Sequence, residues 1–201
     1  MHHTRSWLIA WVAAAIAAGV GAALLARSNQ PVALRAGTAL AERRPITEFS
    51  LVDEHGMPFG RGALEDRWSL VFTGFTHCPD ICPTTLALLA SLRALVPGDE
   101  LQFVFLSVDP ERDTPEQISR YLAHFGPGLV GATGAHVEIE RFTKQLGLAH
   151  VRNPGVGDDY SVDHSTALVL IDPKVRVAGY FQPPHDREAL AADLAALAGG
   201  G

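Results

Sequence analysis

Short apolar runs alternate with turn-forming residues along most of the chain. Residues 70–75 and 101–108 are apolar on both faces, which is typical of strands in a sheet that is covered on both sides. Shorter runs bounded by turn residues predict further strands at residues 49–53, 57–59, 166–171 and 176–181. The last pair flanks Asp172-Pro173-Lys174-Val175, so we expect these two strands to form a hairpin.

Apolar residues spaced three or four apart predict helices between the strands. The predicted helical segments are residues 83–96, 114–125, 137–146 and a final segment after Asp186. In the first of these helices, Leu88, Leu92 and Leu95 are expected to share one buried stripe. The second begins with Thr114-Pro115-Glu116-Gln117, which supplies a capping Thr, a Pro at the first position and a Gln that closes a capping box.

This order of strands and helices predicts an α/β domain. Alternating strands and helices favour a parallel sheet with helices on both faces. The hairpin adds antiparallel strands to that unit, and the only cysteines of the sequence follow the first buried strand. A parallel unit with an appended hairpin and a paired-cysteine turn predicts a thioredoxin-like fold.

A long uncharged segment precedes this domain. Residues 7–25 contain no charged side chain and are bracketed by Arg5 and Arg27, a length that can cross a bilayer. Two interpretations compete: an N-terminal transmembrane helix, or a signal peptide cleaved near Gly21-Ala22-Ala23. The length favours the helix. We therefore expect residues 1–27 to form a membrane anchor, residues 28–45 a linker and residues 46–201 the globular domain.

Charge and cysteine usage bear on the compartment. The net charge of −6, without a Lys/Arg cluster, argues against a nucleic-acid partner. Paired cysteines are commoner in oxidising compartments. We therefore expect a single-pass protein of the inner cell membrane whose domain faces the periplasm or another extracytoplasmic space.

The strongest chemical signal is the pair Cys78 and Cys82, which are separated by Pro79-Asp80-Ile81. They lie where a predicted strand turns into a predicted helix, and the positive end of the helix dipole favours thiolates there. A structural disulfide would close so small a loop that it would stabilise the fold only modestly. The other interpretations are thiol–disulfide exchange, for which thioredoxin-type sites have two intervening residues, and metal binding. Thiolate ligands favour Cu(I), with zinc as the competitor.

A third metal ligand is expected among the histidines. His164 directly precedes a predicted hairpin strand, and neighbouring strand ends converge at one edge of a sheet, so we expect it near the cysteine turn. Asp163 is either an orienting group at that site or a turn residue. The ring of His77 is expected to point away from the side chain of Cys78. A solvated side chain is the default expectation for His55, His124 and His136.

Charged residues follow the second buried strand at Asp109, Arg112 and Asp113. They lie at the end of a strand, at the edge of a sheet where sites usually form. An Arg between two carboxylates most simply predicts a structural ion-pair cluster. A supporting role around the site, or a surface for a partner, is the alternative.

The sequence around the cysteines resembles the signature of the Sco/SenC family of copper-binding proteins. The matching block is Gly74-Phe75-Thr76-His77-Cys78-Pro79-Asp80-Ile81-Cys82-Pro83-Thr84-Thr85-Leu86. Further blocks agree in order and spacing: Ser107-Val108-Asp109-Pro110-Glu111-Arg112-Asp113-Thr114-Pro115-Glu116, and Asp163-His164-Ser165-Thr166 with Asp172-Pro173. One departure is Val175, where the family often has Gly, so a less tight hairpin turn is expected.

The resemblance implies a thioredoxin-like fold on a membrane tether and copper bound by Cys78, Cys82 and His164. It also implies copper delivery, or thiol reduction, during assembly of the dinuclear copper site of cytochrome c oxidase. The implied partners are the copper-site subunit of the oxidase and a protein that donates copper.

We therefore predict a copper chaperone rather than an enzyme. The main alternative is a thiol–disulfide oxidoreductase that uses the same pair, with Cys78 as the attacking thiol. A peroxidase of the same fold is disfavoured because Val71 and Phe75 stand where that family has Pro and Thr before its cysteine. A copper sensor or buffer without an oxidase client stays open.

Overall fold

The computed structural model describes residues 15–16, 19, 34–96, 98–156 and 159–198. The chain divides into residues 1–32 and residues 33–201. In the first unit only residues 15, 16 and 19 are described, and they are helical, so the anchor predicted over residues 7–25 otherwise lies outside the described residues. Within the described part of the chain, no helix is both long enough and apolar enough to cross a membrane.

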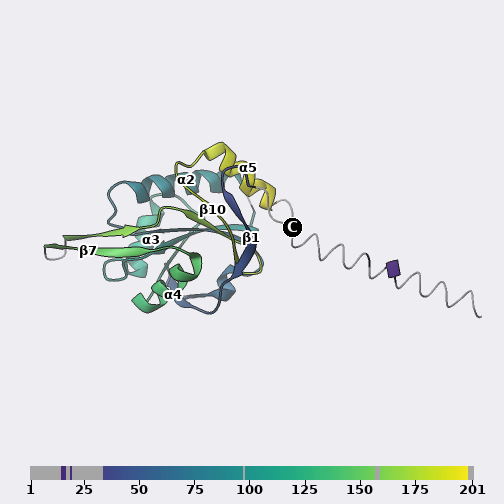
Figure 1. The fold of residues 1–201 in the computed structure, drawn as a ribbon. Coiled ribbons are helices and arrows are strands. Elements are labelled where there is room, and N and C mark those ends of the chain that lie inside the picture. The colour runs from purple at the N-terminus through teal and green to yellow at the C-terminus, as the bar shows by residue number, and fades with distance from the viewer. Residues whose placement is uncertain (1–14, 17–18, 20–33, 97, 157–158, 199–201) are drawn as a thin grey trace, which may run out of the picture. The chain divides into compact units, whose positions relative to one another are not determined.

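A mixed sheet forms the centre of the second unit (Figure 1). In the described residues its eight strands lie in the order β1-β10-β9-β4-β5-β6-β2-β3. Their bounds are β1 (Thr38–Pro45), β2 (Ser50–Asp53), β3 (Pro58–Gly60), β4 (Trp68–Gly74), β5 (Leu101–Ser107), β6 (Leu129–Thr133), β9 (Leu168–Ile171) and β10 (Arg176–Phe181). Strands β4, β5 and β6 run parallel, and β9 pairs antiparallel with β4. The two predicted buried strands therefore lie side by side, with Leu70 opposite Phe103.

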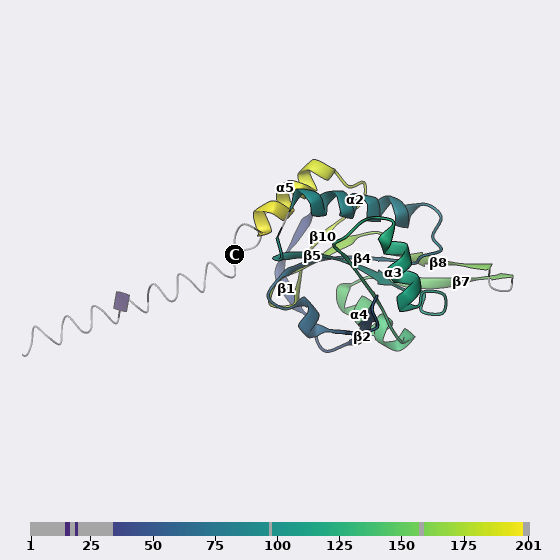
Figure 2. The same ribbon diagram turned by 180° about the vertical axis from the view of Figure 1, so that it is seen from behind.

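Helices cover both faces of this sheet. Helices α2 (Ile81–Leu95) and α5 (Arg187–Ala198) lie side by side over one face, and α4 (His136–Leu146) covers the other (Figures 1 and 2). Helix α3 (Pro115–Ala123) packs on β6, and a short 3-10 helix, η1 (Arg61–Leu64), follows β3. This is the α/β arrangement of the thioredoxin-like fold that the sequence predicts.

Helix α2 is turned differently on the sheet from the prediction. Its buried stripe runs through Cys82, Leu86, Leu89, Leu92 and Val96, so Leu92 is buried as predicted. Leu95, which was expected on the buried stripe, has a side chain that is 50% exposed. The residues of the actual stripe are spaced three or four apart, so Cys82 becomes part of the packed face of the helix.

The linker predicted over residues 28–45 is wrong over its last part. Residues 38–45 form strand β1, which pairs antiparallel with β10, with Thr38 opposite Tyr180. Strand β1 lies at the edge of the sheet and most of its side chains are exposed. An exposed strand needs no alternation of apolar and polar residues, and the segment Ala41-Glu42-Arg43-Arg44 shows none. Pairing with a distant strand, rather than a local pattern, makes this segment extended.

A second sheet lies outside the main one. Strands β7 (His150–Val156) and β8 (Asp159–His164) pair antiparallel as a hairpin that extends away from the main sheet (Figures 1 and 2). The strands predicted from the sequence include none at β6, β7 or β8. Both β6 and the hairpin contain Gly or Asp residues that weaken the strand pattern. Their extended form comes from pairing with neighbours.

Candidate metal centre

Cys78 and Cys82 lie where β4 gives way to α2, as predicted. Strand β4 ends at Gly74 and α2 begins at Ile81, so Cys82 sits in the first turn of the helix. Both cysteines are free thiols; Cys78 is partly buried and Cys82 is fully buried. The turn that leads into Cys78 is closed by the Cys78 N–H, which donates to the carbonyl oxygen of Phe75 at 3.2 Å.

Gly74 makes room for the buried sulfur. A Cβ atom at this position would lie 2.8 Å from Sγ of Cys82 and 2.9 Å from the ring of Phe105. Side-chain carbons do not approach neighbours so closely, so a residue without Cβ is needed where β4 passes the sulfur.

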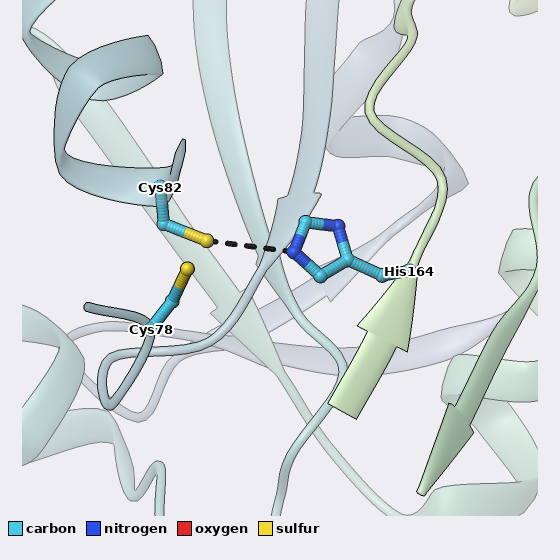
Figure 3. Close-up of side chains that lie close together, drawn as sticks. All are labelled: Cys78, Cys82 and His164. Atoms are coloured by element: carbon cyan, nitrogen blue, oxygen red, sulfur yellow. Dashed lines mark hydrogen bonds between the residues drawn. The ribbon is translucent and has the colours of Figure 1, made fainter. Parts of the chain in front are cut away.

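His164 ends β8 and turns its ring toward the cysteines (Figure 3). Its Nε2 lies 3.5 Å from Sγ of Cys82, and its Nδ1 lies 3.0 Å from the carbonyl oxygen of Ser165. A carbonyl oxygen only accepts hydrogen bonds, so Nδ1 carries the ring proton. The Nε2 lone pair is therefore free to accept the Cys82 S–H or to bind a metal ion.

The three side chains converge on one point. Cys78, Cys82 and His164 each offer one ligand atom, and these atoms lie within 4.8 Å of one another. No other set of three or more His, Cys, Asp or Glu side chains in the described part of the chain meets this condition. Two sulfurs suit soft ions such as Cu(I), and imidazole suits copper and zinc. The structure thus brings together the residues that the sequence predicts as metal ligands.

Burial dominates the electrostatics of this site. Burial raises the pKa of the Cys82 thiol far above its usual range, although a backbone hydrogen bond from Phe75 opposes the rise. The predicted thiolate is therefore wrong for Cys82, because loss of hydration outweighs the helix dipole. Burial also lowers the pKa of His164, against smaller effects of the Ser165 carbonyl and Asp163. Without metal, the site holds a Cys82 thiol beside a neutral imidazole.

Aromatic rings hold the imidazole in place. The rings of Phe72 and Phe75 meet the His164 ring nearly edge-on, each with centroids 6.0 Å away. The sequence analysis placed both rings in an apolar strand, and Phe75 also in the block that resembles the Sco/SenC signature, without assigning either ring a role at the site. Their position near the end of β4, just before the cysteines, was the feature of the sequence that could have indicated contact with a metal ligand.

The charged residues after β5 divide into two sets of contacts. Arg112 Nε donates to Oδ2 of Asp109 at 2.5 Å, which is the predicted ion pair. Asp113 is fully buried and instead accepts hydrogen bonds from Thr76, from its N–H at 2.9 Å and from its hydroxyl at 2.6 Å. Asp163 is exposed, and its charge only opposes the fall in the pKa of His164.

The other histidines that the structure describes lie outside the ligand group. His77 is exposed, with its Nδ1 3.1 Å from the hydroxyl oxygen of Thr76, in agreement with the prediction that it turns away from Cys78. Exposed side chains are also found, as expected, at His55, His124 and His136. The sequence did not single out His150, which lies opposite His164 in the β7–β8 hairpin. Its pKa is lowered by burial.

Comparison with known proteins adds a family to this geometry. A family model described as SCO1/SenC matches residues 38–199. A protein of Stutzerimonas stutzeri is 40% identical over 154 residues, which cover 75% of this chain and 76% of the relative. Mitochondrial SCO1 homolog 1 of Arabidopsis thaliana is 33% identical over 166 residues, which cover 81% of this chain and 50% of the relative. This chain therefore spans about half the length of the plant relative.

A solved structure matches the same region. The crystal structure of Arabidopsis thaliana ScoI with copper bound superposes with a TM-score of 0.71 at 32% sequence identity. The match covers 77% of this chain and 98% of that chain. The fold of this domain is thus shared with a copper-bound protein.

Proposed function

This chain belongs to the SCO1/SenC family, and we propose on that basis that it binds copper through Cys78, Cys82 and His164 and delivers it to an acceptor protein. The observation that carries the proposal is the convergence of three soft or borderline ligand atoms within 4.8 Å. The copper bound to ScoI of Arabidopsis thaliana, in a structure that matches most of this chain, supports copper over zinc.

The state of the ligands suggests how copper is taken up. Thiols must lose their protons to bind a metal, so uptake releases protons, most of all from buried Cys82. His164 needs no such change, because its Nε2 lone pair already faces the site. The protein thus supplies one ready ligand, the His164 imidazole, and a buried Cys82 thiol that is deprotonated as the ion enters.

The exposure of the cysteines suggests how copper leaves. Cys78 is more exposed than Cys82, which is fully buried. An incoming thiol from an acceptor reaches copper first on the Cys78 side. Copper then passes by exchange of one ligand at a time, without a change in the fold.

Thiol–disulfide exchange is the alternative function, and the free, neighbouring thiols favour it. The Cys78 thiolate would attack a sulfur of a target disulfide and form a mixed disulfide. Cys82 would then attack Cys78, releasing the target as a dithiol and leaving the Cys78–Cys82 disulfide. Electrons pass from this pair to the target, so a separate dithiol reductant must reduce the pair again.

Removal of the imidazole separates the two functions. His164→Ala should bind Cu(II) far more weakly than the unmodified chain, by more than the roughly tenfold to hundredfold loss that follows changes to outer partners of metal ligands. Its cysteine pair should still cycle between dithiol and disulfide, because exchange needs no imidazole ligand. Copper titration and a redox titration of the full chain measure these properties.

A matched control and a cellular assay complete this test. His124→Ala removes an exposed histidine at the end of α3 and should leave copper binding unchanged. In a strain that lacks the native gene, His164→Ala should fail to support assembly of cytochrome c oxidase. Full rescue by a variant that binds no copper would replace copper delivery with thiol reduction.

We further propose that residues 1–27 anchor the chain in the inner membrane, with the globular domain outside the cytoplasm. The uncharged run at residues 7–25 supports this. The proposed client is the copper-site subunit of cytochrome c oxidase, which would receive copper from this domain after a donor protein had loaded it. A periplasm-dependent reporter fused after Gly201 should be active, and activity of only a cytoplasm-dependent reporter would contradict the orientation.

A further inference from the structure

The two halves of the copper site come from separate parts of the fold. The cysteines lie on the turn between β4 and α2 in the main unit, whereas His164 ends a hairpin that extends away from the main sheet (Figures 1 and 3). A site of this kind needs contacts that fix the hairpin relative to the turn, because small displacements of a ligand weaken metal binding. The loop of residues 109–113, after β5, touches both.

One end of this loop holds the cysteine turn. The carboxylate of Asp113 accepts hydrogen bonds from the N–H and the hydroxyl of Thr76, at 2.9 and 2.6 Å. It also accepts one from the hydroxyl of Ser107, at 2.5 Å. Thr76 lies two residues before Cys78, and Asp113 is fully buried, so these bonds fix the path of the turn in a region that excludes water.

The other end of the loop holds the histidine hairpin. The hydroxyl of Tyr160, four residues before His164 on β8, donates to Oδ1 of Asp109 at 2.6 Å. Arg112 pairs with the other oxygen of Asp109 and also donates to the backbone oxygen of Tyr160 at 3.1 Å. Its guanidinium carbon lies 3.6 Å from the centroid of the Tyr160 ring.

These contacts reach Tyr160 in different ways. Its hydroxyl, backbone oxygen and ring all meet residues of the loop, and both Tyr160 and Asp109 are buried. Burial, with the Asp109 carboxylate, raises the pKa of Tyr160 to about 12, so the hydroxyl keeps its proton and acts as the donor. The exposed pair of Arg152 on β7 and Glu111 in the loop, 2.6 Å apart, adds a peripheral contact.

We infer that the loop of residues 109–113 holds the cysteine turn and the histidine hairpin in register, and that Tyr160 is the positioning residue through which the loop acts on His164. The inference rests on the proposed copper site. It assigns the Asp109–Arg112 pair a role at a distance from the ion: the pair anchors the strand that presents the imidazole.

The variant Tyr160→Phe tests this role, because it keeps the ring and its stacking and removes only the hydroxyl. In the full chain we expect Cu(II) affinity to fall roughly tenfold to a hundredfold, as for other outer partners of metal ligands. In the copper-free protein, amide hydrogen exchange at Val162, Asp163 and His164 should become faster. The reduction potential of the cysteine pair should not change, because Asp113 still holds the turn.

Tyr180→Phe is the matched control. The Tyr180 hydroxyl donates to the carbonyl oxygen of Leu146 at 2.8 Å and accepts a hydrogen bond from Arg44, so this variant loses hydrogen bonds of its own, none of which involves the hairpin. It should keep the copper affinity and hairpin exchange of the unmodified chain. Unchanged affinity and exchange in Tyr160→Phe would overturn the inference, and so would an equal loss of affinity in Tyr180→Phe. If the unmodified chain binds no copper, the proposed function fails, and exchange in the hairpin alone decides whether Tyr160 holds it.

Discussion

At the scale of single residues, the site depends on how closely the buried sulfur is enclosed. Cys82 lies at a helix start, where the dipole favours a thiolate, yet it is packed without solvent contact against β4. Transfer of a thiolate from water into such a site is strongly unfavourable, so the thiol form is kept until a metal ion replaces the proton. The absence of a side chain at Gly74 lets this packing form.

We expect Gly74→Ala to damage the site and the fold together. The added carbon would meet Sγ of Cys82 at 2.8 Å, so either the sulfur or the helix must move. Overpacking of this kind costs about 1–3 kcal/mol of unfolding free energy, and displacement of a ligand should weaken copper binding. Denaturant unfolding and copper titration measure the two effects.

The control for this change is Gly62→Ala. A Cβ at Gly62 would have no neighbour within 4 Å, so stability and copper affinity should stay near those of the unmodified chain. Copper affinity unaltered in Gly74→Ala would show that the close contact does not matter for the site.

At the scale of elements, the turn of the β9–β10 hairpin is held by one buried carboxylate. Asp172 accepts hydrogen bonds from Arg43 of β1 and from Arg176, each at 2.8 Å, and from the N–H groups of Lys174 and Arg176. The turn is closed by the Val175 N–H, which donates to the Asp172 carbonyl at 2.8 Å, so the expected loosening is not observed. The backbone of Val175 has a φ of 57°, which is unfavourable for a β-branched residue, and its side chain is fully buried.

Asp172→Ala should therefore destabilise the protein strongly. The change leaves Arg43 and Arg176 without this carboxylate in a largely buried place, and breaking such a pair costs about 3–5 kcal/mol. Denaturant unfolding of the variant measures the loss. Glu65→Ala, which breaks an exposed pair with Arg61, should lower stability by no more than about 1 kcal/mol. Equal effects of the two changes would contradict the importance of the turn.

At the scale of the whole molecule, half-buried histidines make stability depend on pH. Burial lowers the pKa of His150, His164 and His185 below the usual value of 6.5. The unfolded chain therefore binds more protons than the folded chain once the pH falls to about 6.5 or lower. Unfolding free energy should be fully retained above that pH and should decline as the pH is lowered through the folded-state pKa values.

His185 allows a test away from the metal ligands. In His185→Gln, the fall in unfolding free energy between about pH 7.5 and pH 5 should be smaller than in the unmodified chain, since one histidine no longer takes up a proton on unfolding. Denaturant unfolding at several pH values gives this slope. An unchanged slope would show that His185 does not contribute to the pH dependence.

Local sequence determined the central part of this protein. Neighbouring residues determine the apolar runs of β4 and β5 and the spacing of apolar residues in α2, because buried positions repeat with the period of each element. Neighbouring residues also determine the start of α3, where the Thr114 hydroxyl accepts a hydrogen bond from the Gln117 N–H. The two cysteines therefore fall at a strand–helix turn on sequence evidence alone. The approach of His164 also followed, because strand ends meet at one edge of a sheet.

Only the tertiary structure decided the features that depend on distant partners. Strands β1, β6 and the β7–β8 hairpin are extended because they pair with other strands, and their own residues show no strong pattern. The protonated state of Cys82 follows from exclusion of water by the packed core, which outweighs the local helix dipole. The lone pair that His164 offers, and the anchoring of its strand by Tyr160, arise from hydrogen bonds that no sequence spacing encodes.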